Sequence, residues 1–484
     1  MKAAGILAGT SLALLLLLPR GFETPGVSGV QLHQTGFLLA GVASAFLWAC
    51  HRRRRHESWK IDLLLFAILG SAVVSAAVSG VALAKPRWLL YPIVMLFIPF
   101  VLARSAMRGG GSGALLRVVQ LVAVALALMA IGEHIAQKKI FGARTFYDEQ
   151  ELVYTLTLGR KWNAAGVTDV PLSSIGPFAN NLPLAGVFTA VGGLLIGLRR
   201  SVWGVGVASL LVGCAVHAIQ SRAGLISLLF FLGAYAASDR ARARSLAATI
   251  GVALSFAITI GRIGYIPWIV TFSNDIYAPE VAGAAIVLPV VLGFVTWAAA
   301  RTSAIRVLTT FVVGASALVV AASFVSGGGD GDAGGLGGRL YGNSLFVRNL
   351  WLHPLGTGPG SLFQHDEALG VEIFSDQGSL QTFCGELGIV SGICLSIVII
   401  RSISLAARSG SRIAIAAGLG IAAATPGVLI AVPPEPWIVI VAFACVIEGT
   451  CSSGTVVQHE PVRSAALRTS DRSKLRVNSS GTSV

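Results

Sequence analysis

Long apolar runs separated by short polar connections make up most of this chain. A helix needs about 20 apolar residues to cross the hydrocarbon of a bilayer, and a central Arg or Asp costs roughly 2.5–3.5 kcal/mol there. The interiors of these runs are nearly free of charge. We therefore predict an all-α, polytopic membrane protein with about 14 transmembrane helices (12–14). The predicted spans are 2–18, 35–50, 61–84, 88–103, 115–132, 181–198, 202–219, 223–238, 246–261, 281–300, 307–325, 378–400, 412–431 and 437–450.

The connections alternate in charge along the chain. If the N-terminus is cytoplasmic, every second connection faces the cytoplasm, and all of these are basic. Cytoplasmic loops are enriched in Lys and Arg, so both ends of the chain are expected inside. This placement accounts for the net charge of +14 and excludes a nucleic-acid partner. The basic connections read HRRRRHESWK, RSAMRGGGSGALLR, RRS, DRARARS, RTSAIR, RSISLAARSGSR and the C-terminal tail.

The amino-acid composition also indicates a membrane protein. Charged residues make up 12% of the chain and hydrophobic residues 54%, whereas soluble domains average about 25% charged residues. The first apolar run lacks a small-x-small cleavage site, so we expect a retained anchor. The six cysteines lie in or beside spans, which predicts no structural disulfide.

Two long outer loops divide the predicted bundle, and such loops tend to carry function. We expect the second one to hold catalytic residues. The expected segments are N-terminal helices 1–132, a first loop 133–180, central helices 181–325 with an SRAG element, a large loop 326–377, C-terminal helices 378–450, and a disordered basic cytoplasmic tail 451–484.

The sequence HPLGTGPG, residues 353–360, interrupts the large outer loop. Pro354 disfavours helical backbone at His353 and predicts the end of a helix that begins near Arg339. The three spaced glycines, Gly356, Gly358 and Gly360, permit a tight turn. Two interpretations stay open from the residues alone. The segment is a structural turn, or its backbone N–H groups bind an anion.

The order of motifs in this region resembles the second half of bacterial O-antigen ligases and O-antigen polymerases. The similarity consists of Arg339, the HPLGTGPG turn with its Pro354 fifteen residues after Arg339, and GELGIVSG, residues 385–392. QSRAGLISLLFFL resembles the family's SR element and puts Arg222 at the outer mouth of a span. GPFANNLPLAGVF resembles an earlier family motif, with Asn181 or its neighbour in the asparagine position.

The resemblance implies a membrane glycosyltransferase in the bacterial cytoplasmic (inner) membrane. Such a protein moves a saccharide from an undecaprenyl-diphosphate carrier to a hydroxyl of a glycan, lipid or protein acceptor on the outer face. Arg222 and Arg339 are the candidate ligands of the lipid diphosphate, because guanidinium groups bind phosphate oxygens bidentately and stay charged. A ligase and a polymerase differ in their acceptor, and the sequence leaves that choice open.

The acceptor hydroxyl needs a base or an orienting acceptor. His365 and Asp376 in the large loop are the catalytic candidates. Glu386 and Asn181 are expected to support the site, and Pro354 with the three glycines to form the structural turn. The outer carboxylates lack a compact ligand spacing, so we expect transfer without a metal or another cofactor.

The alternative is a multi-pass transporter or flippase of lipid-linked glycans. Such a protein favours ionisable residues near the bilayer midplane, helix breaks at matched positions and an internal repeat. His217 is the nearest candidate for a buried ionisable group, but it lies close to an outer end. No clear repeat is present.

Overall fold

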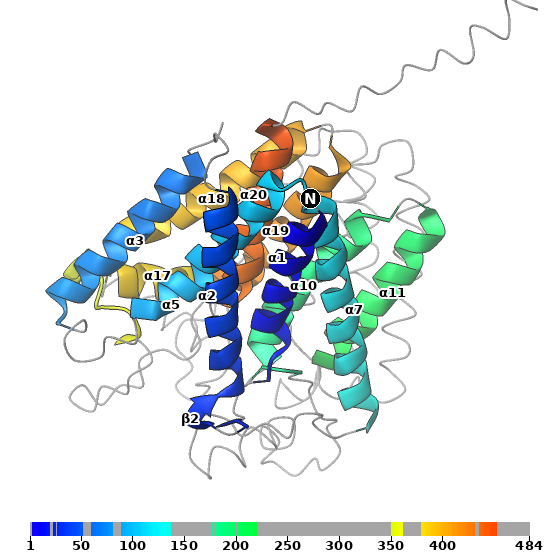
Figure 1. The fold of residues 1–484 in the computed structure, drawn as a ribbon, viewed down its shortest axis with the longest axis horizontal. Coiled ribbons are helices and arrows are strands. Elements are labelled where there is room, and N and C mark those ends of the chain that lie inside the picture. Colours follow the sequence, from blue (N-terminus) through cyan, green and yellow to red (C-terminus); the bar gives the residue numbers. More distant parts are fainter. Residues whose placement is uncertain are drawn as a thin grey trace, which may run out of the picture.

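The computed structural model describes residues 2–19, 23–25, 27–51, 60–80, 89–136, 176–178, 181–199, 201–219, 350–361, 379–409, 411–430 and 435–452. These residues form a bundle of apolar helices (Figure 1). The helices are α1 (Lys2–Leu17), α2 (Leu32–His51), α3 (Lys60–Val78), α5 (Leu90–Pro92), η2 (Ile93–Phe97), α6 (Ile98–Arg108), α7 (Ser112–Ala136), α10 (Asn181–Gly197), α11 (Val202–Ile219), α17 (Ser379–Leu387), α18 (Ile389–Arg408), α19 (Arg412–Ile430) and α20 (Pro436–Ser452).

One small sheet departs from the all-α prediction. Strands β1 (Glu23–Thr24) and β2 (Val27–Gln31) pair antiparallel between α1 and α2, with Thr24 opposite Val27. The sequence between these partners is Pro-Gly, which favours a tight turn, and valine favours strands. The correction is local and leaves the helical class unchanged.

Five of the described helical segments are long and apolar enough to cross a membrane. They are α2, α3, the continuous run α5–η2–α6, α7 and α18. Large apolar side chains face outward on them, as Leu38 of α2 (69% exposed) and Leu63 of α3 (57% exposed) illustrate. The protein is therefore membrane-embedded. The predicted spans 223–238, 246–261, 281–300 and 307–325 lie outside the described residues, as does the tail beyond residue 452.

The described helices differ from the predicted spans at several places, and α7 and α18 continue to Ala136 and Arg408, beyond the predicted ends at 132 and 400. α3 ends at Val78 instead of continuing to residue 84, and Gly80 follows it with a φ of 72°. The fourth span runs on to Arg108 through Arg104, which was expected in a connection. The predicted span 378–400 is two helices, because Gly388 (φ 91°, ψ 166°) separates α17 from α18.

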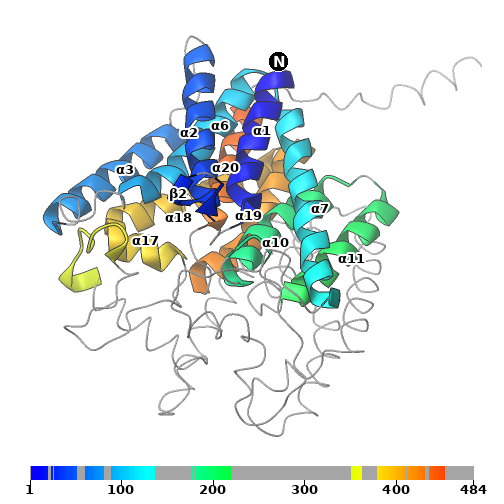
Figure 2. The ribbon, with the colours of Figure 1, turned by 60° about the horizontal axis from the view of Figure 1, so that its bottom comes forward.

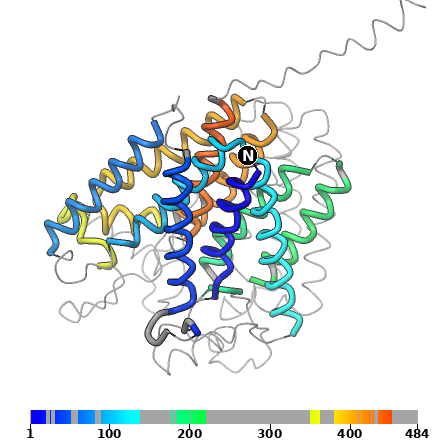
Figure 3. Tube along the Cα trace, viewed as in Figure 1, coloured from blue at the N-terminus to red at the C-terminus, as the bar shows by residue number. Residues whose placement is uncertain are grey.

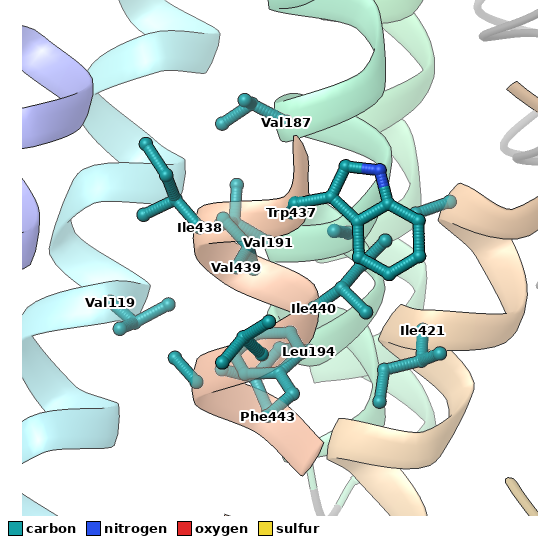
Figure 4. Close-up of a cluster of buried hydrophobic side chains, with 14 of the residues drawn as sticks. Val119, Val187, Val191, Leu194, Ile421, Trp437, Ile438, Val439, Ile440 and Phe443 are labelled. Carbon is teal, nitrogen blue, oxygen red and sulfur yellow. The ribbon is translucent and has the colours of Figure 1, made fainter. Parts of the chain in front are cut away.

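α20 lies at the centre of the bundle, where it packs against α6, α10, α18 and α19. Its side chains from Trp437 to Ile447 are all buried. Figure 4 shows Trp437, Ile440 and Phe443 packed among residues of α10 and α19. Glycines bring these helices close together, since a Cβ on Gly420 of α19 would lie 2.7 Å from the backbone oxygen of Ala190 in α10. Small residues at such contacts are typical of membrane helix packing.

Charge divides the bundle into two ends. We call the basic end the one that holds the start of α1, the α6–α7 and α10–α11 connections and the end of α20 (Figures 1 and 3). Contacts join these parts: Gly5 lies against Gly111, and Arg412 donates a hydrogen bond to the backbone oxygen of Arg199. Within the described ranges every Lys and Arg belongs to this end, namely Lys2, Lys60, Arg104, Arg108, Arg117, Arg199, Arg401, Arg408 and Arg412.

Candidate functional site

Residues 353–361, here called the turn segment, lie at the opposite end from the basic connections, beside α17 (Figure 2). Gly356, Gly358 and Gly360 have φ angles of 91°, 100° and 74°. Side chains with a Cβ rarely adopt these conformations. The three glycines thus allow the chain to reverse within a few residues after the short helical stretch 350–352.

The partner of the turn segment is the helix break at Gly388, between α17 and α18. A helix end leaves several backbone carbonyl groups without intrahelical partners, and in a membrane each must be satisfied within the protein. At the end of α17 these are the carbonyl oxygens of Gly385, Glu386 and Leu387. All three accept hydrogen bonds from elsewhere in the chain.

The turn segment donates three of these hydrogen bonds. Thr357 contributes its N–H (2.9 Å) and its hydroxyl (3.2 Å) to the oxygen of Gly385. The N–H of Gly358 lies 3.1 Å from the oxygen of Glu386. In the reverse direction, the N–H of Ile389 at the start of α18 donates to the oxygen of Pro354 over 3.0 Å. The two segments therefore form one hydrogen-bonded unit.

Two serines of α3 that were not predicted as site residues complete the unit. The hydroxyl of Ser75 donates to the oxygen of Glu386 over 2.5 Å and accepts from the N–H of Gly358 over 3.0 Å. The hydroxyl of Ser71 donates to the oxygen of Leu387. Ser71 and Ser75 are four residues apart, so they share one face of α3. A one-turn spacing of serines opposite a helix break is the signal that could have found them.

Steric contacts in this packing explain why both motifs have glycine at these positions. A Cβ on Gly356 would meet the oxygen of Glu386, the hydroxyl of Ser75 and the nitrogen of Gly388. A Cβ on Gly388 would lie 2.8 Å from the backbone of Leu355. A Cβ on Gly392 would overlap the sulfur of Cys384, because α17 folds back against α18 there.

Hydrogen bonding within the unit bears on the anion-binding interpretation. The N–H of Gly356 donates to the oxygen of His353 over 2.9 Å, and the N–H of Ser361 donates to the oxygen of Gly358 over 3.1 Å. Together with Thr357 and Gly358, four N–H groups of the turn segment are engaged inside the protein. Those four are not offered to an anion.

Glu386 points from α17 into a buried aromatic environment. Its side chain is fully buried, and both Glu386 and Glu435 interact electrostatically with Tyr91. The ring of Phe383 lies 5.9 Å from that of Tyr91 and 5.7 Å from that of Trp437. The indole N–H of Trp437 donates to the hydroxyl of Ser379 over 2.9 Å. The first turn of α17 is thereby tied to the start of α20.

A carboxylate inside a membrane bundle, such as that of Glu386, needs a partner, and an arginine would serve. The arginines of the described ranges all lie at the basic end, so none of them takes that place. Within the same ranges, no three His, Cys, Asp or Glu side chains are grouped to hold a metal ion.

The GPF motif before α10 is anchored by another buried carboxylate. The N–H of Gly176 donates to Oε2 of Glu133 in α7 over 2.9 Å, and Phe178 is 1% exposed. Asn181 is the first residue of α10. Glu133 had been assigned to the first outer loop, but α7 continues to Ala136. The motif therefore begins against the last turn of α7.

A buried ion-pair network at the basic end was not predicted. Nη2 of Arg104 lies 2.7 Å from Asp62 and 3.0 Å from Glu448, and Arg401 lies 3.4 Å from Glu448. The side chains of Arg104 and Glu448 are 2% exposed. The network joins α3, α6, α18 and α20. Arg104 thus belongs inside the bundle, because two carboxylates from distant parts of the chain neutralise it.

The remaining site candidates, Arg222, Arg339, His365 and Asp376, lie outside the described residues. No protein-family model, curated protein or solved structure matches this chain.

Proposed function

We propose that the protein is a membrane glycosyltransferase similar to O-antigen ligases and polymerases. It would transfer a saccharide from an undecaprenyl-diphosphate carrier to an acceptor hydroxyl, in the synthesis of a cell-surface polysaccharide. One observation carries the proposal: HPLGTGPG and GELGIVSG, the two motifs on which the resemblance mainly depends, dock onto each other through backbone hydrogen bonds. Motifs that serve one site are expected to lie together in this way.

The distribution of charge supports an outer site in the bacterial cytoplasmic membrane. The described Lys and Arg residues gather at the end opposite the turn segment, and the positive-inside rule assigns such an end to the cytoplasm. The turn segment and α17 then lie on the side of the outer leaflet. A lipid-linked donor presents its diphosphate at the same level.

The proposed saccharide transfer requires stabilisation of the leaving diphosphate charge and one proton acceptor. The acceptor oxygen attacks the anomeric carbon of the donor, the bond from that carbon to the diphosphate oxygen breaks, and the diphosphate leaves with its negative charge. Arg222 and Arg339 would stabilise this charge, to which preorganised donors contribute a few kcal/mol each. Asp376 or His365 would take the proton of the acceptor hydroxyl. Each of these four roles can be tested by substitution of the residue.

Two observations favour the alternative, a transporter or flippase of lipid-linked glycans. They are the helix break at Gly388 and the buried ion pairs of Arg104. The position of the Arg104 ion pairs along their helices argues against a transport role for them. Arg104 and Glu448 each lie four residues before the end of their helix, which is about 6 Å at 1.5 Å per residue. The midplane is about 15 Å from the boundary of the hydrocarbon. The pairs are therefore better explained as a clamp between helices.

The experiment is a gel of surface glycans and lipid-linked intermediates from a strain that lacks the gene, complemented with wild type or with Arg339→Ala. Single repeats without long chains mean that a polymerase is missing. Unattached long lipid-linked chains mean that a ligase is missing. Arg339→Ala should be stable in the membrane and inactive. Intermediates trapped on the cytoplasmic side would instead identify a flippase and overturn the proposal.

A further inference from the structure

Three large apolar side chains stand out from the protein around the turn segment. Trp351 is 83% exposed, Leu352 64% and Leu355 48%. They belong to a loop that sequence analysis assigned to the aqueous outer face. Exposing them to water is unfavourable by about 25 cal/mol per Å² of apolar surface. Their exposure therefore calls for an apolar medium next to the turn segment.

The attachment of the turn segment indicates which medium this is. Pro354 is hydrogen-bonded to Ile389, and Leu355 lies against Gly388. The next two side chains of α18, Ile389 and Val390, are themselves 41% and 47% exposed. α18 is one of the helices suited to crossing a membrane. The exposed side chains of the turn thus lie beside the lipid-facing surface of a spanning helix.

The bonds of the turn segment to α3 point to the same medium. Gly358 is bonded to Ser75, three residues before the end of α3 at Val78. This distance is about 4.5 Å along the helix axis. The 19 residues of α3 span about 28 Å, close to the roughly 30 Å of bilayer hydrocarbon. Val74 and Val78, on either side of Ser75, are 46% and 65% exposed. The backbone near Gly358 therefore lies beside the exposed apolar end of α3, another helix suited to crossing a membrane.

Four N–H groups of the turn segment meet the condition that lipid sets for irregular backbone. Non-helical backbone at membrane depth must have its polar groups satisfied by the protein. The N–H groups of Gly356, Thr357, Gly358 and Ser361 all donate hydrogen bonds within the described residues. Trp351 suits the boundary itself, because tryptophan is enriched at membrane interfaces.

We propose that Trp351, Leu352 and Leu355 insert into the lipid leaflet at the end opposite the basic connections and hold the turn segment at the membrane surface. The occupant of this apolar face is the acyl-chain and headgroup region of membrane lipids. The inference is independent of glycosyl transfer, since it depends only on the exposed side chains and on their contacts with α3 and α18.

The test uses tryptophan fluorescence of the full chain in lipid vesicles. The emission of wild type minus that of Trp351→Phe isolates Trp351, and phenylalanine keeps the site apolar. We compare quenching by lipids brominated near the headgroup end of the acyl chains with quenching by aqueous iodide. Trp203, which is 85% exposed at the start of the apolar helix α11, serves as the exposed reference at the basic end through Trp203→Phe. Trp437, which is fully buried, serves as the protected control through Trp437→Phe.

We expect brominated lipid to remove most of the Trp351 emission and iodide to remove little of it. Emission lost to iodide but not to brominated lipid would overturn the proposal by placing Trp351 in water. Emission lost to neither quencher would also overturn it, because another part of the protein would then cover the site. If Trp437→Phe fails to fold, the comparison of Trp351 with Trp203 still decides.

Discussion

Thr357 gives both its N–H and its hydroxyl to the backbone oxygen of Gly385, over 2.9 Å and 3.2 Å. This pair of hydrogen bonds joins the two most recognisable motifs of the chain. It also explains how α17 can end within the membrane region, because its last carbonyl groups are satisfied by a turn and by two serines.

Gly356→Ala should destabilise the protein. Its φ of 91° is unfavourable for alanine, and the added Cβ would meet the oxygen of Glu386 and the hydroxyl of Ser75. Left-handed backbone at a residue other than glycine costs about 1–3 kcal/mol. A lower midpoint of thermal unfolding in detergent would report the loss. The matched control is Gly70→Ala in α3, where a Cβ has no neighbour within 4 Å. Equal midpoints for the two variants would disprove the packing described for the turn segment.

Gly392→Ala should be tolerated only when Cys384 is shortened as well. The new Cβ would occupy the position of the Cys384 sulfur, and overpacking of this kind costs about 1–3 kcal/mol. Cys384→Ala removes the sulfur and leaves its own Cβ 3.3 Å away from the new methyl group. The double variant should therefore unfold at a higher temperature than Gly392→Ala alone. Strictly additive losses would contradict the close contact of α17 with α18.

Removal of one partner from the buried ion pairs should harm stability more than removal of both. Arg104→Met leaves the carboxylate of Glu448, which is 2% exposed, with only the more distant Arg401. Such a change costs about 3–5 kcal/mol. The variant Arg104→Met with Glu448→Met removes both buried charges and leaves Asp62 and Arg401, whose side chains are 24% and 28% exposed. Thermal unfolding in detergent measures all three proteins. A double variant less stable than Arg104→Met would count against the network.

The helical class and several helix boundaries could be predicted from the sequence. Helices α10 and α11 begin where the apolar runs indicated, at Asn181 and Val202. Such boundaries depend on nearby residues, because a long uncharged run between polar connections has few alternatives in a bilayer. The conformation of Gly388 was not predictable in the same way. The break depends on hydrogen bonds from Thr357 and Ser75, which are far away in sequence.

The candidate site could be predicted only in part, for the same reason. The sequence indicated the turn at Gly356, but it did not indicate that Ser71 and Ser75 would meet the carbonyl groups of α17. The sequence also indicated a cytoplasmic connection at Arg104. Its buried position depends on Glu448, which lies 344 positions further along the chain. Interactions between distant segments have no periodic signal that a single sequence reveals.

We propose above that the turn segment and the helix break at Gly388 form part of the functional site of a saccharide transferase. The most direct test of this proposal is transfer by purified protein in vesicles supplied with lipid-linked glycans extracted from the strain that lacks the gene. Wild type and Gly70→Ala should lengthen or transfer the glycan and release undecaprenyl diphosphate, while Gly356→Ala should lose most of this activity at a temperature where it stays folded. Transfer by Gly356→Ala at the rate of Gly70→Ala would contradict the role of the turn segment. Absence of any transfer by wild type would contradict the proposed function itself.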